Sequence, residues 1–139
     1  MTESRSPALA ALLLRLSLGT MFIAHALLKY FVFTLPGTAQ AFESLGLPGV
    51  LGYAVFAAEL VGGVLLIAGV RTRVVALALV PVMLGATWAH AGNGWLFSGP
   101  NGGWEFPAFW TIALIVQALL GDGAYALRPS IRQPEMRTA

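Results

Sequence analysis

Four long stretches of this chain contain almost no charged side chains. They cover about residues 8–30, 50–70, 74–91 and 105–127. A helix rises about 1.5 Å per residue, so about 20 apolar residues are enough to cross the hydrocarbon core of a bilayer. The pattern therefore predicts an all-α integral membrane protein, a four-transmembrane-helix bundle that forms one domain over residues 1–139.

The composition excludes several classes of function. Only 10% of the residues are charged and 58% are hydrophobic, which leaves too few charges to cover a water-soluble domain. Cysteine is absent, so the chain holds no disulfide, thiol relay or cysteine-ligated metal, and a partner or small molecule would have to carry electrons. The pI is near 9.5, but the arginines lie at the ends of apolar stretches and form no patch for nucleic acid.

The segments between the stretches are rich in residues that break helices. Residues 32–49 contain two prolines and three glycines among mixed apolar and polar residues, which predicts a loop with a short helix at the membrane surface. Residues 92–104 are glycine-rich and include Trp95 and Trp104, which is typical of a loop at the interface. Residues 128–139 are expected to form a polar cytoplasmic tail.

The positive charges predict an orientation. With four crossings, six arginines fall on one side of the membrane: Arg5, Arg71, Arg73, Arg128, Arg132 and Arg137. Lys29 falls on the other side, so the positive-inside rule places both termini in the cytoplasm. The first stretch could instead be a cleaved signal peptide, because Ala24-His25-Ala26 resembles a cleavage site; Arg15 and the apolar stretches that follow favour a retained helix.

Ionisable residues share one face of the first predicted helix. Arg15, His25 and Lys29 are separated by helical steps that keep them, with Leu18 and Phe22, within an arc of roughly 80°. A charged side chain at membrane depth costs about 2.5 kcal/mol or more, so this face should point into the bundle.

These positions predict a polar pocket open toward the outer face. Glu59 lies near the middle of the second stretch, beside glycines that allow close helix packing. His90 and Glu105 lie at the outer ends of the third and fourth stretches. We expect the pocket to be lined by His25, Lys29, Glu59, His90 and Glu105, and to be covered by Trp95 and Trp104.

Other interpretations of the same residues stay open. Glu59 could pair with Arg15 or Lys29 and only fix the packing of the helices. His25 and His90 could ligate a haem, or a metal with help from a carboxylate; a hydrogen-bonded pair that holds a quinone-like head group fits the residues better. Gln117 and Asp122 are weaker candidates, and Asp122 is expected at the inner interface near Arg128.

The order of motifs resembles the DoxX family of small bacterial membrane proteins with four helices. The motifs are RLSLGTMFIAHALLKYF, SLGLPG, AAELVGGVLLIAGVRTR, WAHAGNGW and GGWEFP, and the resemblance covers about residues 10–125. Its most specific residues are Arg15, His25, Lys29, Glu59, Gly62, Gly63, Thr72, Arg73 and His90. The chain departs from the family at Ala26, where glycine is usual.

The resemblance implies a bundle in the bacterial inner membrane and a link to quinone, catechol or thiol-stress chemistry. The family takes its name from a subunit of a thiosulfate:quinone oxidoreductase, and members often act beside a soluble oxidoreductase. We therefore expect a membrane component that binds a quinone-like molecule. Glu59 and His25 would handle protons, Lys29 and His90 would hold polar oxygens, and Arg15 would set the charge of Glu59. A membrane scaffold, a solute carrier and a homo-oligomer are alternatives.

Overall fold

The computed structural model describes residues 5–130, and all regular elements in that range are helices. The predicted all-α class is confirmed. The elements are α1 (Ser6–Leu27) with a π-helical continuation η1 (Leu28–Val32), α2 (Leu35–Ser44), α3 (Val50–Ala68), α4 (Thr72–His90) with a 3₁₀ turn η2 (Ala91–Asn93), and α5 (Glu105–Leu120). The short helix expected within residues 32–49 is α2.

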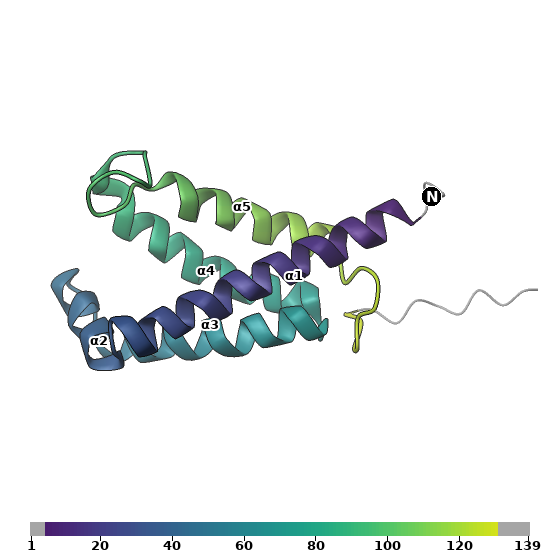
Figure 1. Ribbon diagram of the computed structural model, residues 1–139, viewed down its shortest axis with the longest axis horizontal. Helices are drawn as coiled ribbons and strands as arrows, with labels where there is room; N and C mark the ends of the chain where they lie inside the picture. Colours follow the sequence, from purple (N-terminus) through teal and green to yellow (C-terminus); the bar gives the residue numbers. More distant parts are fainter. Residues whose placement is uncertain (1–4, 131–139) are drawn as a thin grey trace, which may run out of the picture.

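The long helices form two pairs, α1 with α3 and α4 with α5 (Figure 1). The pairs meet at one end, which carries the α3–α4 turn and residues 121–130 and which we name the closed end. They diverge toward the other end, the open end, where α2 and the loop of residues 94–104 lie (Figure 1). The core between the pairs includes Leu18, Phe22, Leu66, Leu79, Met83, Trp110 and Leu114.

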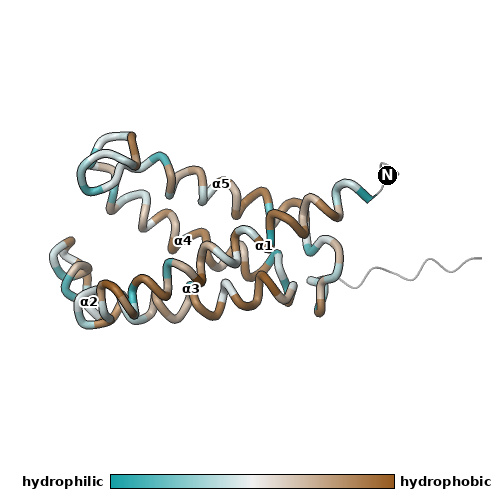
Figure 2. The backbone as a smooth tube through the Cα atoms, in the orientation of Figure 1, coloured by the Kyte–Doolittle hydropathy of each residue, from teal (hydrophilic) through white to brown (hydrophobic). Residues whose placement is uncertain are grey.

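Three helices are long and apolar enough to cross a membrane: Ser6–Val32, Val50–Ala68 and Thr72–Asn93. Helix α5 is also apolar, but its 16 residues are fewer, and at 1.5 Å per residue they measure about 24 Å against the roughly 30 Å of a bilayer core. Hydrophobic residues follow the long helices, and most hydrophilic residues gather toward the two ends (Figure 2).

Helices α1 and α3 touch through their backbones. A Cβ added to Gly19 would lie 2.7 Å from the carbonyl oxygen of Gly63, and one added to Gly63 would lie 2.8 Å from that of Gly19. Only glycine permits this separation, and such small-residue contacts hold helices together in lipid, where no hydrophobic effect drives them to associate. The close packing expected at Gly63 is therefore present, with Gly19 as its partner.

The prediction of a fourth helix extending to residue 127 is wrong, because α5 ends at Leu120. Gly121 and Gly123 take φ of 89° and 73°, which a helix cannot accommodate. The chain then turns back under the bundle, and the N–H groups of Leu127 and Arg128 donate to the carbonyls of Ala68 and Gly69. Of the predicted tail, residues 128–130 belong to this cap and 131–139 lie outside the described range.

Asp122 joins this cap to the start of α4. One carboxylate oxygen accepts from the Thr72 N–H at 3.1 Å and from the Ser130 hydroxyl at 2.9 Å, and the other accepts from the Ser130 N–H at 2.9 Å. Burial on its own raises the pKa of Asp122, but the hydrogen bonds from Ser130 and Thr72 outweigh it and hold the pKa below its usual value. Asp122 lies at the end that carries Arg128, as expected, but its partners are Thr72 and Ser130.

Arg15 is 1% exposed and connects three segments at the closed end. Its guanidinium donates to the carbonyls of Leu66 and Ile67 in the last turn of α3, at 3.1 and 3.0 Å. A third hydrogen bond, 2.8 Å long, reaches the carbonyl of Ala124 in the cap. The guanidinium lies against Gly69, where any Cβ would collide with it. A cation is well placed there, since the last carbonyls of a helix carry partial negative charge.

Replacing Arg15 by methionine should lower the free energy of unfolding by about 3 kcal/mol, because three charge-assisted hydrogen bonds are lost. Denaturation of the purified protein with sodium dodecyl sulfate in mixed micelles measures this. Leu13→Met on the same helix is the control, because Leu13 is 68% exposed. Equal stability of the two variants would contradict the role given to Arg15.

Candidate functional site

Lys29 and Glu59 form an ion pair between α1 and α3, near the open end. The Lys29 Nζ lies 2.8 Å from Oε2 and 3.1 Å from Oε1 of Glu59, so both carboxylate oxygens accept from it. Only 6% of the Glu59 side chain and 18% of the Lys29 side chain are exposed. Lys29 belongs to the π-helical turn η1, a distortion that often occurs at functional sites.

His25 lies one turn before Lys29 on α1. Its Nδ1 is 2.8 Å from the carbonyl oxygen of Met21 on the preceding turn, which leaves Nε2 for another partner. The imidazole centroid is 4.8 Å from the Trp110 ring, edge to face, and 6.4 Å from the Phe106 ring. The histidine thus connects the ion pair with the aromatic face of α5.

The α4–α5 pair and the loop that joins its helices carry the other predicted site residues, which are His90, Trp95, Trp104 and Glu105. The His90 Nδ1 is 2.8 Å from the carbonyl oxygen of Gly102. One carboxylate oxygen of Glu105 accepts from the Phe97 N–H at 3.3 Å. The rings of Trp95 and Trp104 are 6.2 Å apart. These side chains hold the glycine-rich loop against the start of α5.

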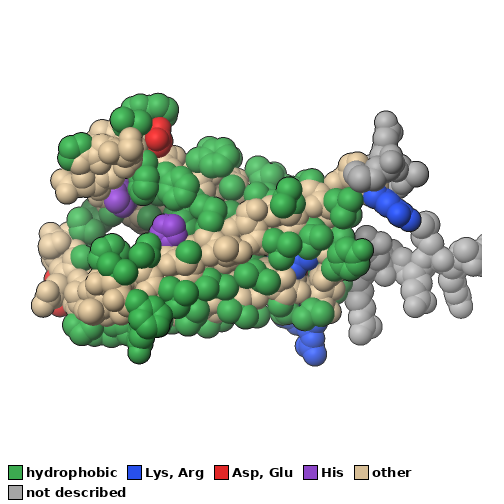
Figure 3. Space-filling model, in the orientation of Figure 1, with side chains coloured by type: hydrophobic (Ala, Val, Ile, Leu, Met, Phe, Trp, Pro, Cys, Tyr) green, Lys and Arg blue, Asp and Glu red, His purple; other side chains and the backbone are tan. Residues whose placement is uncertain are grey.

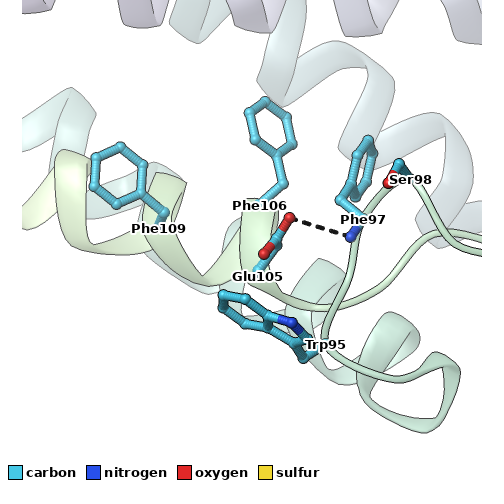
Figure 4. A pocket seen from close by; sticks show the side chains of 6 residues that line it. All are labelled: Trp95, Phe97, Ser98, Glu105, Phe106 and Phe109. Atoms are coloured by element: carbon cyan, nitrogen blue, oxygen red, sulfur yellow. Dashed lines mark hydrogen bonds between the residues drawn. The ribbon is translucent and has the colours of Figure 1, made fainter.

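A groove of about 490 Å³ lies beside this loop (Figure 4). The Glu105 carboxylate lies next to the Trp95 ring, with Phe97 and Phe106 nearby and Phe109 further along α5 (Figure 4). The groove is lined by Trp95, Phe97, Ser98, Glu105, Phe106 and Phe109. It takes in two of the predicted site residues, Trp95 and Glu105.

The predicted pocket residues therefore form two groups. One is the charged group of His25, Lys29 and Glu59 on the α1–α3 pair; the other is the loop group of His90, Trp95, Trp104 and Glu105. Rings connect them, because Phe106 lies 5.0 Å from Phe97, and Phe97 lies 6.2 Å from His90. The space-filling view shows a hollow between the two helix pairs at the open end, bordered by the histidine side chains (Figure 3).

Of the two partners expected for Glu59, the structure has Lys29 and not Arg15. The carbonyl partners of Arg15 on α3 lie seven and eight residues beyond Glu59, or about 10 Å along the helix axis. The histidines do not hydrogen-bond to each other, since each Nδ1 binds a backbone carbonyl. Gln117 is fully buried and donates to the carbonyls of Ala11 and Gly121, so it ties α5 to α1.

Trp110 is a member of the site that sequence reasoning missed. It is 3% exposed, and its indole N–H has no hydrogen-bond partner among residues 5–130. A buried indole N–H normally finds an acceptor. Its position was readable from the sequence, because Phe106 and Trp110 are four residues apart and share a helix face. Within the same range, no three His, Asp or Glu side chains come together to hold a metal ion.

The family model for DoxX matches residues 10–92, more than half of the chain. The chain belongs to the DoxX family. The matched range contains His25, Lys29, Glu59 and His90, whereas the aromatic face of α5 lies beyond it. Membership in DoxX and the apolar helices together make this a membrane protein.

One curated relative of this DoxX protein comes from Bacillus subtilis (strain 168) and bears the name "Putative oxidoreductase CatD". The two sequences are 39% identical over 83 residues. The aligned part covers 60% of this chain and 60% of the relative, so less than two thirds of either protein is compared. No solved structure matches the chain.

We predict strong energetic coupling between Lys29 and Glu59, because they form a nearly buried ion pair. Lys29→Met alone should lower the free energy of unfolding by about 3 kcal/mol, because it leaves the Glu59 carboxylate buried without its partner. Lys29→Met combined with Glu59→Gln should stay within about 1 kcal/mol of the native protein, because no uncompensated charge remains. Detergent denaturation of the four proteins of the cycle measures the coupling. Additive effects would show that the two side chains do not interact.

Proposed function

We propose that this protein is the membrane-embedded component of a redox system and that it binds a quinone-like lipophilic molecule. The binding place is the space between the two helix pairs at the open end. The charged group of His25, Lys29 and Glu59 forms one wall, and the aromatic face of α5 with Phe106 and Trp110 forms the other.

The observation that carries this proposal is the nearly buried ion pair next to aromatic rings. Burying two charges costs several kcal/mol per ion, and apolar residues of similar size would often hold two helices together better. A pair retained at such a place therefore favours a role in binding or proton transfer. A flat apolar ring with polar oxygens suits the combination of aromatic walls and a few polar groups, which is typical of small-molecule sites.

Each polar residue has a proposed role. His25 and Glu59 accept and return protons, because imidazole and a carboxylate beside a lysine can both exchange them. Lys29 still has one N–H that Glu59 does not use, and this N–H can donate to a ligand oxygen. His90 holds a second oxygen from the loop side. Trp95, Trp104 and Glu105 shape the entrance through the loop.

We further propose four crossings of the bacterial inner membrane, with both termini in the cytoplasm. Helix α5 packs along α4 for its whole length, and it needs only modest bilayer thinning to span. The arginines Arg5, Arg71, Arg73 and Arg128 all belong to the closed end, as the positive-inside rule requires of a cytoplasmic face. A soluble oxidoreductase would supply or take the electrons, since the chain has no cysteine to relay them.

A scaffold role is the second candidate, and one observation favours it. Arg15, Lys29 and Gln117 all find partners within the chain, as expected of groups that only order helices. The Nε2 of His25, which the hydrogen bond at Nδ1 leaves free, favours ligand binding instead.

The content of quinone in the purified protein tests the proposal. We expect quinone to be enriched over bulk membrane lipid in protein extracted with mild detergent, as measured by mass spectrometry. The enrichment should fall about tenfold in the double variant Lys29→Met with Glu59→Gln, because a charge-assisted hydrogen bond to the head group is lost.

Phe31→Ala is the control for this measurement, because Phe31 is 72% exposed and has no proposed role in binding. It should keep the enrichment of the native protein. A quinone content equal to that of bulk lipid in all three proteins would favour the scaffold role over the proposed function.

A further inference from the structure

We infer that the site recognises the reduced, hydroxyl-bearing form of its ring, a diphenol, in preference to the oxidised carbonyl form. This inference rests on the proposed function, because it assumes that an aromatic redox molecule binds beside His25. Beyond the proposed function, we infer that the reduced form binds more tightly and that His25 Nε2 distinguishes the two forms.

The hydrogen bond of His25 to its own helix fixes the tautomer of the ring. A carbonyl oxygen can only accept, so Nδ1, at 2.8 Å from the Met21 oxygen, must carry a proton. In the neutral imidazole the other nitrogen, Nε2, is then a bare acceptor. The helix backbone therefore presents the site with a lone pair and not with an N–H.

A lone pair distinguishes hydroxyl from carbonyl. The O–H of a diphenol donates to Nε2, whereas the oxygen of a quinone is itself an acceptor and opposes it. An acceptor that is desolvated and left unpaired costs more free energy than an ordinary hydrogen bond contributes. The oxidised form is thus disfavoured at this nitrogen even where the two rings have the same shape.

The neighbouring groups suit the oxygen of the same hydroxyl. That oxygen can accept as well as donate, and Lys29, one helical turn after His25, has an N–H that Glu59 does not use. One hydroxyl therefore satisfies an acceptor and a donor at once, whereas a carbonyl satisfies only the donor. Phe106, whose ring lies 6.4 Å from the imidazole, supplies aromatic surface for the ring itself.

The test compares a short-chain benzoquinone with its hydroquinone and with the dimethyl ether of the hydroquinone. Anaerobic titration into the purified protein in nanodiscs, followed by tryptophan fluorescence, gives three dissociation constants. We expect the hydroquinone to bind about tenfold more tightly than the quinone and the ether, since neither of these can donate to Nε2.

His25→Phe is the diagnostic variant, because phenylalanine keeps the ring and removes the lone pair. In this variant the quinone should bind more tightly, because it no longer leaves an acceptor unpaired, the hydroquinone should bind less tightly, and the two dissociation constants should agree within about twofold. Phe31→Ala is the control and should keep the preference, because Phe31 is 72% exposed and has no proposed role in binding.

The outcomes separate this inference from the proposed function. Equal binding of quinone and hydroquinone to the native protein, or a preference that survives His25→Phe or disappears in Phe31→Ala, overturns the inference while ring binding stands. Failure of all three compounds to bind to a protein that remains folded by circular dichroism overturns the proposed function itself.

Discussion

The guanidinium of Arg15 hydrogen-bonds to the last carbonyls of α3 and to the cap of residues 121–130 from inside the closed end. A membrane protein must satisfy such polar groups internally, because the bilayer offers them no water. These bonds fix where α1 crosses the end of α3 and where the chain returns after α5. Gly69 is required beside the guanidinium for the same reason, since a side chain there would displace it. Arg15 thus joins α1, the end of α3 and the cap at the closed end.

Because the two helix pairs are joined at the closed end, they can separate at the other. The backbone contact between Gly19 and Gly63 keeps α1 and α3 together along that length, so their ion pair of Lys29 and Glu59 stays on one side of the opening. The aromatic face of α5 lies on the other side. This division explains how a small chain with few polar residues can keep a charged group close to apolar rings without exposing it to lipid.

The sequence predicted the all-α class, the three longer helices and the face that Arg15, His25 and Lys29 share, because apolar runs and helical spacing are local properties of a sequence. It narrowed the partner of Glu59 to Arg15 or Lys29, and the structure selects Lys29.

The end of α5 was missed because apolar residues resume after Gly121 and Gly123 and resemble a continuing helix. The partners of Arg15 were missed because they are backbone carbonyls, whose availability depends on where a neighbouring helix ends. The unpartnered N–H of Trp110 depends on packing between helices, and sequence spacing suggests only its face.

The central claim is that a ring binds between the helix pairs, and photoaffinity labelling tests it most directly. The protein in nanodiscs is irradiated with a photoreactive quinone analogue, and the labelled peptides are mapped by mass spectrometry. The account predicts adducts within residues 22–29 of α1 and 106–110 of α5, both removed by excess unlabelled hydroquinone. Adducts confined to lipid-facing positions such as Val61 and Leu119, which are 57% and 74% exposed, and unaffected by the competitor, would contradict it.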